Sequence, residues 1–259
     1  MRWGWFLGVI TSSLLVVVGV SMLTHNHYQR NVLTVATSAD YCPYEFVSIT
    51  EGQRTLEGFD IDVMEAIATR LGTTVQFEEM PFSGIFPKLQ TDKTDVAIAA
   101  ITPTDERRRV SQFSKIYYEA QSTVVSRQDF RVDEPVNLKD RLIGVKPGTV
   151  HELWVKTQTE KEIVPFQKAR EGLRKLRLRR LDAVVMDQTV AEKYGISQTD
   201  FCTLTLPNEE PAGVAIAFPR SSKLVGQVNR ILDELESDGT LSELVVKWFD
   251  DYTCELETT

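Results

Sequence analysis

The residues with the clearest chemistry follow a short apolar run at positions 96–101. Thr102 supplies a hydroxyl group at the end of this run, and Arg107 supplies a planar cation in the segment that follows. An Arg guanidinium can bind a carboxylate through two parallel hydrogen bonds. A Thr hydroxyl and strand-end carbonyl oxygens, such as that of Ala100, can accept hydrogen bonds from an ammonium group. This combination suits the head group of a free α-amino acid.

A buried strand and a helix would position these groups. Residues 96–101 form an apolar run of the length expected for a strand that is buried on both faces. Pro103 interrupts the run, and Thr104 is a suitable N-cap for a helix that begins with Asp105 and Glu106. Ligands of open α/β sheets bind beyond the carboxyl ends of the strands. The position therefore favours a binding site, although the same pattern also fits an ordinary strand-to-helix turn.

A second strand-to-helix turn, at residues 146–150, could complete such a site. It contains Gly148, followed by Thr149 and Val150. Backbone N–H groups at the start of a helix bind anions. Thr149 and Val150 could therefore share a ligand carboxylate with Arg107, although a turn without a ligand would look the same.

The composition is that of an ordinary soluble globular protein. The chain has 259 residues, of which 42% are hydrophobic and 25% are charged, enough for one large domain or two small lobes. The formal net charge is −8, and the only charged residues within positions 1–30 are Arg2 and Arg30. Nucleic-acid binding depends on basic surfaces, so this acidic balance argues against a nucleic-acid partner. No spacing of His, Cys, Asp or Glu indicates a metal site, and no motif indicates a cofactor.

One long apolar segment, residues 6–23, lies near the N-terminus. It is typical of an export signal, and its length is close to that of a membrane span. No small-residue cleavage site stands out, and no Cys follows the segment to accept a lipid. Residues 1–30 are therefore either a cleaved signal peptide or a retained membrane anchor, and both place the rest of the chain outside the cytoplasm.

Several motifs resemble those of the family 3 solute-binding proteins, which capture polar amino acids for ABC transporters. The family's strand-end motif A-G-x-T-x-T-x-E-R corresponds to AAITPTDER at residues 99–107. Further similar runs are GFDIDV at residues 58–63, FSKIYY at residues 113–118 and DAVVMD at residues 182–187. The resemblance covers about residues 32–250.

The resemblance implies roles for five further residues. It implies that Tyr41 and Phe82 enclose the ligand side chain between two rings, and that Ser38 recognises this side chain. It also implies that Asp187 pairs with the α-ammonium group and that Met186 lines the side-chain pocket. Ser38 stands where many relatives have Asp, which favours a neutral or mixed pocket. The plainer alternatives are a surface aromatic for Tyr41, a core residue for Phe82 and a helix N-cap for Asp187.

The resemblance also implies an α/β fold of the type II periplasmic binding protein class. Two lobes with mixed sheets would be joined by a two-strand hinge, with crossings near residues 117–121 and 209–214. Residues 31–118 and 212–259 would form the first lobe, and residues 119–211 would form the second.

On this resemblance we expect a monomeric periplasmic protein, either free or tethered by its N-terminal segment. It would close around a polar amino acid and deliver it to an ABC permease in the inner membrane, without enzymatic activity. Glutamine is the first choice of ligand. Arginine is the second, because two rings could also enclose a guanidinium group.

Two alternatives remain, a cyclohexadienyl or arogenate dehydratase-like enzyme on the same fold and a membrane-anchored amino-acid sensor. The enzyme would need a general acid in the cleft. Glu45 is the one extra carboxylate in the pocket loop, the loop at residues 38–46 that follows the first predicted strand. Its neighbours suggest that its side chain is exposed.

The chain has three cysteines, Cys42, Cys202 and Cys254. One disulfide and one free thiol would suit an exported protein. Because Cys42 lies in the expected pocket loop, the predicted bridge is Cys202–Cys254. Three unpaired thiols are the alternative.

Overall fold

The computed structural model describes residues 32–194, 201–207 and 213–255. The predicted signal or anchor at residues 1–30 and most of the predicted second crossing lie outside the described residues. None of the helices in the described ranges is long and apolar enough to cross a membrane.

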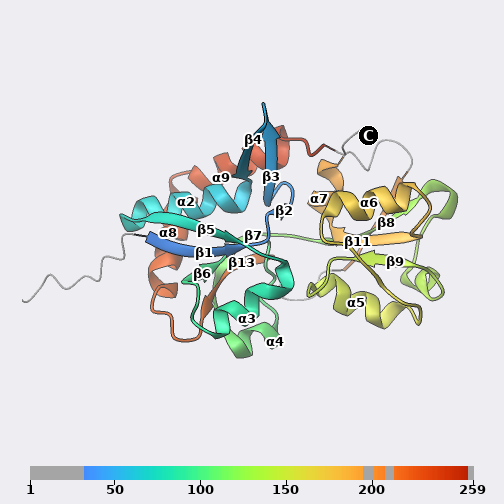
Figure 1. Cartoon of the computed structure of the whole chain (residues 1–259), viewed down its shortest axis with the longest axis horizontal. Coiled ribbons are helices and arrows are strands. Elements are labelled where there is room, and N and C mark those ends of the chain that lie inside the picture. Colours follow the sequence, from blue (N-terminus) through green and yellow to red (C-terminus); the bar gives the residue numbers. More distant parts are fainter. Residues whose placement is uncertain (1–31, 195–200, 208–212, 256–259) are drawn as a thin grey trace, which may run out of the picture. The chain divides into compact units, whose positions relative to one another are not determined.

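The first lobe is built on a five-stranded mixed sheet (Figure 1). Its strands, in spatial order, are β5 (Thr74–Glu79), β1 (Val32–Thr37), β6 (Val96–Ala97), β13 (Val214–Pro219) and β7 (Ser111–Tyr118). β1 runs parallel to β5 and β6, whereas β13 runs antiparallel to β6 and β7. Its helices are α2 (Phe59–Leu71), α3 (Ile85–Gln90), α4 (Asp105–Val110), α8 (Val225–Ser237) and α9 (Thr240–Val245), with the 3-10 helix η1 (Phe82–Gly84) and the π-helical turn η5 (Val246–Asp251).

Helices cover both faces of this first sheet, which explains its apolar strands. Val35 and Ala36 are neighbours on β1, yet they pack in different hydrophobic clusters, because successive side chains of a strand point to opposite faces. Figure 1 shows α2 and α3 on opposite sides of the sheet. Gly72 ends α2 in a left-handed conformation, which glycine adopts readily.

The second lobe contains another five-stranded mixed sheet. Its strands, in spatial order, are β10 (Val164–Pro165), β9 (Ile143–Val145), β11 (Ala183–Asp187), β8 (Ser122–Arg127) and β12 (Phe201–Thr205). Its helices are α5 (Val150–Gln158), α6 (Ala169–Arg177) and α7 (Gln188–Lys193), with the 3-10 helices η2 (Gln128–Phe130) and η3 (Pro135–Leu138). These two lobes with mixed sheets confirm the predicted fold class. The chain passes from β7 to β8 between Tyr118 and Ser122, within the predicted first crossing.

A small antiparallel sheet lies at the start of the chain. It consists of β2 (Asp40–Tyr41), β3 (Glu45–Thr50) and β4 (Gln53–Glu57), and β3 and β4 form a hairpin around a turn at Glu51 and Gly52. The loop that joins β1 to this sheet carries the residues from Ser38 to Tyr44. The small sheet therefore holds the pocket loop at the carboxyl end of β1.

The central apolar run forms a shorter strand than its composition predicts. β6 contains only Val96 and Ala97, and the chain then turns at Ala100, which has a left-handed φ of 47°. The backbone N–H of Ala100 donates to Oδ2 of Asp60 at 2.7 Å. Asp60 of α2 therefore stabilises the turn at Ala100 through this hydrogen bond. The family motif has Gly at this position, which tolerates such a conformation more easily.

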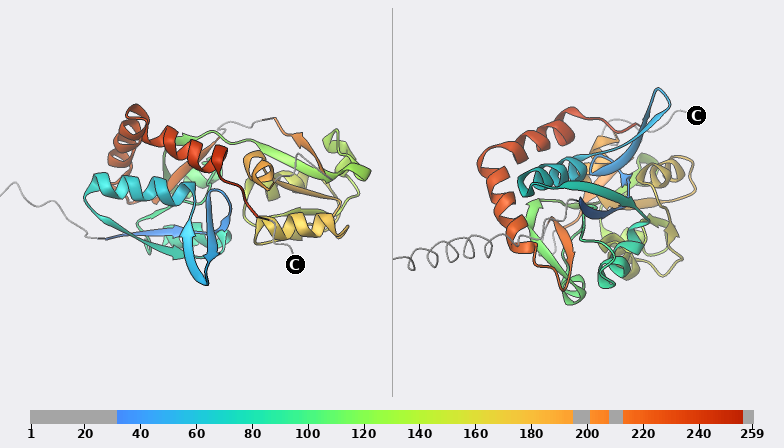
Figure 2. Two further views of the ribbon diagram at one scale, coloured as in Figure 1. Left: turned by 90° about the horizontal axis from the view of Figure 1, so that it is seen from above. Right: turned by 60° about the vertical axis from the view of Figure 1, so that its left-hand side comes forward.

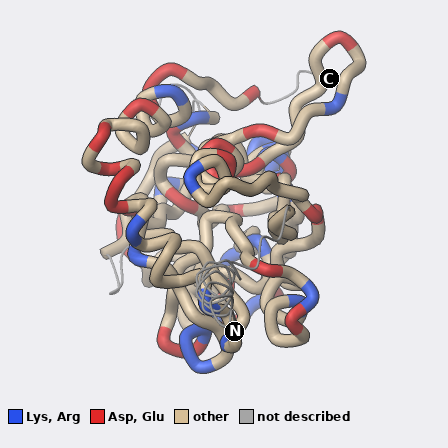
Figure 3. Tube along the Cα trace, turned by 90° about the vertical axis from the view of Figure 1, so that its left-hand side faces the viewer, with Lys and Arg blue, Asp and Glu red and all other residues tan. Residues whose placement is uncertain are grey.

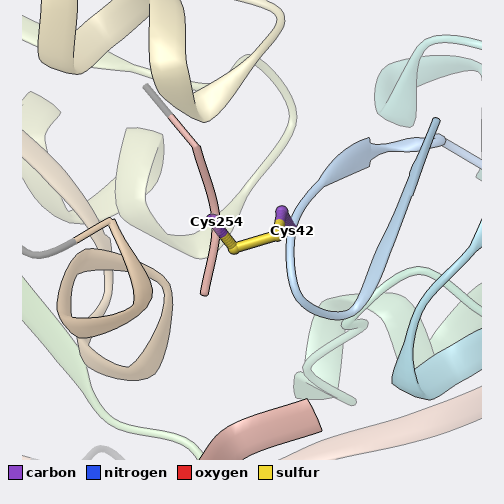
Figure 4. The surroundings of a disulfide bond; sticks show 2 residues. All are labelled: Cys42 and Cys254. Atoms are coloured by element: carbon purple, nitrogen blue, oxygen red, sulfur yellow. A yellow bond between two sulfur atoms is a disulfide. The ribbon is translucent and has the colours of Figure 1, made fainter. Parts of the chain in front are cut away.

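The cysteine pairing predicted from the sequence is wrong. The disulfide joins Cys42 to Cys254 (Figure 4), and Cys202 is a free thiol. Cys202 lies on β12, where its Sγ atom is 3.2 Å from Oγ of Ser126. Helix η5 packs on the first lobe through Phe249, whose ring centroid lies 5.1 Å from that of Tyr44. This packing brings the C-terminal segment past the pocket loop, within reach of Cys42.

Charged residues of both signs are interspersed along the chain trace in Figure 3. Arg70 on α2 pairs with Asp238 beyond the end of α8, and Lys115 on β7 pairs with Asp233 on α8. Exposed pairs of this kind contribute about 0–1 kcal/mol each. Burial of the apolar faces, rather than these ion pairs, accounts for the stability of the first lobe.

Candidate functional site

A narrow cavity between the two lobes brings most of the predicted ligand residues together. The first lobe contributes Tyr41, Phe82, Ala99, Ala100, Thr102 and Arg107 to its lining, and the second lobe contributes Lys146, Thr149, Val150, His151 and Asp187. Eight of the ten predicted residues are in this set. Ser38 and Met186 are not.

Helix α4 and the strand end before it position Arg107. Thr104 caps the helix by accepting a hydrogen bond from the backbone N–H of Arg107 at 3.3 Å. The guanidinium donates to the carbonyl oxygen of Thr102 at 2.6 Å and lies over the rings of Phe82 and Phe86. Burial lowers the pKa of Arg107 to about 10, so the group stays charged at neutral pH. A carboxylate in the cavity would meet a desolvated, oriented cation.

The start of helix α5 faces the cavity from the second lobe. Thr149 caps this helix, because its Oγ1 accepts from the backbone N–H of Glu152 at 3.3 Å, and Val150 is the first helical residue. Gly148 adopts a φ of +79°, and a Cβ atom there would lie 3.3 Å from the Cα of Ser83. The partial positive charge of the helix N-terminus therefore lies on the same cavity as Arg107.

Asp187 supplies the negative charge of the site. It ends β11 and occupies the N-cap position of α7, but its side chain makes no capping hydrogen bond. Its backbone N–H donates to the hydroxyl oxygen of Tyr41 at 3.0 Å. Its carboxylate Oδ1 lies 3.8 Å from Nε2 of His151. Asp187 therefore occupies the N-cap position, as the helix-cap alternative predicts, but its carboxylate does not cap the helix and lines the cavity instead.

Lys146 is a cavity residue that the sequence analysis missed. Its side chain is buried, and its Nζ lies 4.8 Å from the ring centroid of Tyr41 and 5.3 Å from that of Phe82. Nζ donates to Oγ of Ser38 at 3.0 Å and forms an ion pair with Asp40. Burial raises the pKa of Asp40, and the charge of Lys146 opposes that rise. The position at the carboxyl end of β9 was the signal that could have identified Lys146.

His151 is the second cavity side chain that was missed. It is buried on the first turn of α5, and its Nε2 lies 3.1 Å from Oγ of Ser122. Burial lowers the pKa of His151, although the nearby carboxylate of Asp187 opposes the shift. The ring is therefore neutral at pH 7 and leaves the charge of Asp187 uncompensated.

Ser38 and Met186 have different positions from those expected. Successive residues of a strand point to opposite faces, so Asp187 faces the cavity while Met186 packs in the hydrophobic core. Ser38 lies behind the cavity lining, where its Oγ also donates to Oε1 of Glu45 at 2.6 Å. Ser38 therefore reaches the cavity only through Lys146.

Glu45 is fully buried, so its expected exposure is wrong. Burial raises the pKa of Glu45 well above its usual range, and neighbouring Asp60 adds to the rise. Asp60 is also fully buried, and burial raises its pKa to about 7, although hydrogen bonds from Tyr117 and Ala100 oppose the rise. Asp60 lies inside α2, where Gly58 is the N-cap residue, so the side chain supports the pocket strand rather than capping the helix.

The arrangement can hold a zwitterion. Arg107 and the start of α5 face one side of the cavity, where they can bind a carboxylate, and Asp187 can bind an ammonium group. The rings of Tyr41 and Phe82 exclude water beside them, which strengthens charged contacts.

Comparison with known proteins gives consistent matches over most of the chain. Residues 33–251 match the family model of bacterial extracellular solute-binding proteins, family 3. The chain is 31% identical over 230 residues to the arginine-binding extracellular protein ArtP of Bacillus subtilis (strain 168), which covers 85% of this chain and 87% of ArtP.

Two solved structures show the same similarity. One is a crystal structure of the substrate-binding protein of an amino acid ABC transporter, with a TM-score of 0.79 and 33% identity over 85% of this chain and 100% of that one. The other is an ancestral arginine-binding protein bound to arginine, with a TM-score of 0.77 and 33% identity over 85% of this chain and 99% of that one.

Proposed function

The chain belongs to the bacterial extracellular solute-binding proteins of family 3, and on this premise we propose that it captures a polar α-amino acid in the cavity between its lobes. One observation carries the proposal. Arg107 of the first lobe and Asp187 of the second lobe line the same cavity. Their opposite charges match the carboxylate and the ammonium group of one ligand.

Ligand binding would favour the closed arrangement of the lobes. A ligand that contacts residues of both lobes binds the closed state more tightly than the open one, and this difference shifts the population toward closure. The closed, monomeric form would then be recognised by the permease of an ABC transporter in the inner membrane. Residues 6–23 would direct export, so the binding protein would act in the periplasm, either free or tethered.

Glutamine is the first choice of ligand, and Lys146 supports it. A carboxamide or other acceptor group between Tyr41 and Phe82 could accept a hydrogen bond from Nζ of Lys146. A guanidinium at the same place would lie beside a buried ammonium group that has only Asp40 as its ion-pair partner among the described residues. Arginine therefore stays second, although the similar proteins named above include arginine-binding ones.

A thermal-shift screen against the twenty amino acids, followed by calorimetry, tests the proposal. L-glutamine is expected to raise the melting temperature more than L-arginine does. D-glutamine and glutamine amide, which misplace or lack the α-carboxylate, serve as matched controls and should bind weakly. A protein that none of the twenty stabilises would contradict amino-acid capture.

A further inference from the structure

The C-terminal tail, residues 252–255, runs from the first lobe toward the second. It begins at helix η5, which Trp248 and Phe249 anchor in the hydrophobic core. Seen from above in Figure 2, the red tail leaves the end of this helix and reaches the side of the second lobe. There the backbone N–H of Cys254 donates to the carbonyl oxygen of Lys193 at 2.9 Å. Nζ of Lys193 in turn donates to the carbonyl oxygen of Asp250 at 3.0 Å.

The disulfide attaches this tail to the pocket loop. Cys42 directly follows Tyr41, and Figure 4 shows its bond to Cys254. Both cysteines are buried. The same loop contacts the second lobe through Ser38 and Asp40, which both meet Lys146, and through Tyr41, which meets the backbone of Asp187. One covalent bond therefore joins a wall of the ligand cavity to a tail that lies on α7.

We propose that the Cys42–Cys254 disulfide, the tail and the end of η5, where Asp250 contacts Lys193, form a strap that positions the pocket loop against the second lobe and slows ligand release. The proposal rests on the proposed amino-acid capture. When the lobes open, the two hydrogen bonds to Lys193 must break, but the disulfide keeps the tail beside the pocket loop. The broken contacts then re-form at a high effective concentration, which favours reclosure. Fixing the loop before the ligand binds also lowers the entropy cost of ordering it.

The first test removes the disulfide. Cys42→Ser and Cys254→Ser each break the strap, and Cys202→Ser is the matched control, because Cys202 is a free thiol on β12. The probe is the amino acid with the largest thermal shift in the screen, and stopped-flow tryptophan fluorescence measures its dissociation rate. Either strap variant is expected to release the ligand at least fivefold faster. The control is expected to stay within twofold of the unmodified protein.

Loss of a disulfide also lowers stability, so a second variant separates stability from positioning. Lys193→Ala removes the bond to the carbonyl oxygen of Asp250 and leaves the disulfide intact. It is expected to release the ligand faster than the unmodified protein does, with little change in melting temperature. Lys175→Ala is its control, since Lys175 on α6 loses an ion pair with Glu171 and a 3.4 Å contact to the carbonyl oxygen of Pro165, both away from the tail.

The outcomes separate the two proposals. One outcome would overturn the strap: Cys42→Ser and Cys254→Ser melt at a lower temperature but release the ligand at the rate of the unmodified protein, and Lys193→Ala behaves like Lys175→Ala. The disulfide would then only stabilise the fold. If the unmodified protein binds none of the twenty amino acids, the proposed function fails first, and the strap fails with it.

Discussion

The guanidinium of Arg107 donates a hydrogen bond to the carbonyl oxygen of Gly148 at 3.0 Å, from the first lobe to the second. Gly148 directly precedes Thr149, the cap of helix α5, so this bond brings a cation to the start of a helix. The guanidinium of Arg107 and the partial positive charge at the N-terminus of α5 therefore lie close together. A carboxylate placed between them would be attracted to both.

Removal of the charge of either Arg107 or Asp187 should abolish tight binding of the amino acid. Loss of one partner from a buried charged contact costs about 3–5 kcal/mol, which corresponds to at least about a hundredfold in affinity. Arg107→Ala and Asp187→Ala should each show this loss in calorimetry. Arg109→Ala, on the exposed side of the same helix, should bind normally. Unchanged affinity in either Arg107→Ala or Asp187→Ala would refute the proposal that these residues bind the ligand.

Lys146 should decide which side chains the cavity accepts. Lys146→Met keeps an apolar stem of similar length but removes the buried ammonium group. Glutamine affinity should fall by about ten- to a hundredfold, because one charge-assisted hydrogen bond is worth about 1.5–3 kcal/mol. Arginine affinity should rise, because its guanidinium could then occupy the space between the rings and pair with Asp40.

A parallel change at an exposed lysine provides the comparison for Lys146. Lys156→Met, on α5 outside the cavity, should alter neither affinity. Competition calorimetry with both amino acids measures the ratio of the two constants. A ratio that is the same in all three proteins would mean that Lys146 does not select the ligand.

Ala100→Gly should stabilise the protein. A non-glycine residue in the left-handed region costs about 1–2 kcal/mol, whereas glycine adds about 0.4–1 kcal/mol of unfolded-state entropy. The net gain in the free energy of unfolding should be about 0.5–1 kcal/mol. Urea denaturation measures it, and Ala99→Gly, at a neighbouring residue without a positive φ, should destabilise the protein. A loss of stability in both variants would contradict the strain argument.

The stability of the protein should depend on pH through Asp60. Its pKa of about 7 in the folded state lies above its ordinary value of 3.8, so the folded protein holds a proton that the unfolded chain has lost. This contribution to stability is present below about pH 4 and is lost as the pH rises to about 7. Asp60→Asn cannot titrate, so its free energy of unfolding should fall less between pH 5 and pH 8.

Other buried groups must be separated from Asp60. Glu45 has a raised pKa and acts in the same direction, whereas His151 has a lowered pKa and acts in the opposite one. Both remain in the Asp60→Asn variant, but Asp60 contributes to the raised pKa of Glu45, so the difference between the two pH profiles measures Asp60 together with its effect on Glu45. Profiles that run parallel would show that Asp60 does not titrate in this range.

The sequence was most informative where local rules place a side chain. Arg107 lies in the first turn of a helix that follows a buried strand, and Asp187 ends another buried strand at a helix N-cap, so local patterns predict both positions. The pairing of Asp187 with an ammonium group was predicted from the family resemblance. Lys146 follows the same rule, but the inward direction of its side chain depends on Ser38 and Asp40, which are 108 and 106 residues away in sequence. No local pattern records that pairing.

The remaining errors have the same origin. Glu45 looked exposed because its burial depends on α2 and β7, whose positions relative to the pocket loop are set only by the folded lobe. The disulfide joins residues 212 positions apart, and the packing of η5 decides which cysteine meets Cys254. Composition and spacing identify the elements of such sites, whereas long-range packing decides which polar groups face one another.

The position of β13 between β6 and β7 determines when each lobe can finish folding. All five strands of the second sheet precede β13 in the chain, so the ribosome supplies them first. The lobe that begins the chain must therefore wait, with a gap in the middle of its sheet, until residue 219 has been synthesised. The lobe that comes second in the chain can therefore complete its sheet first.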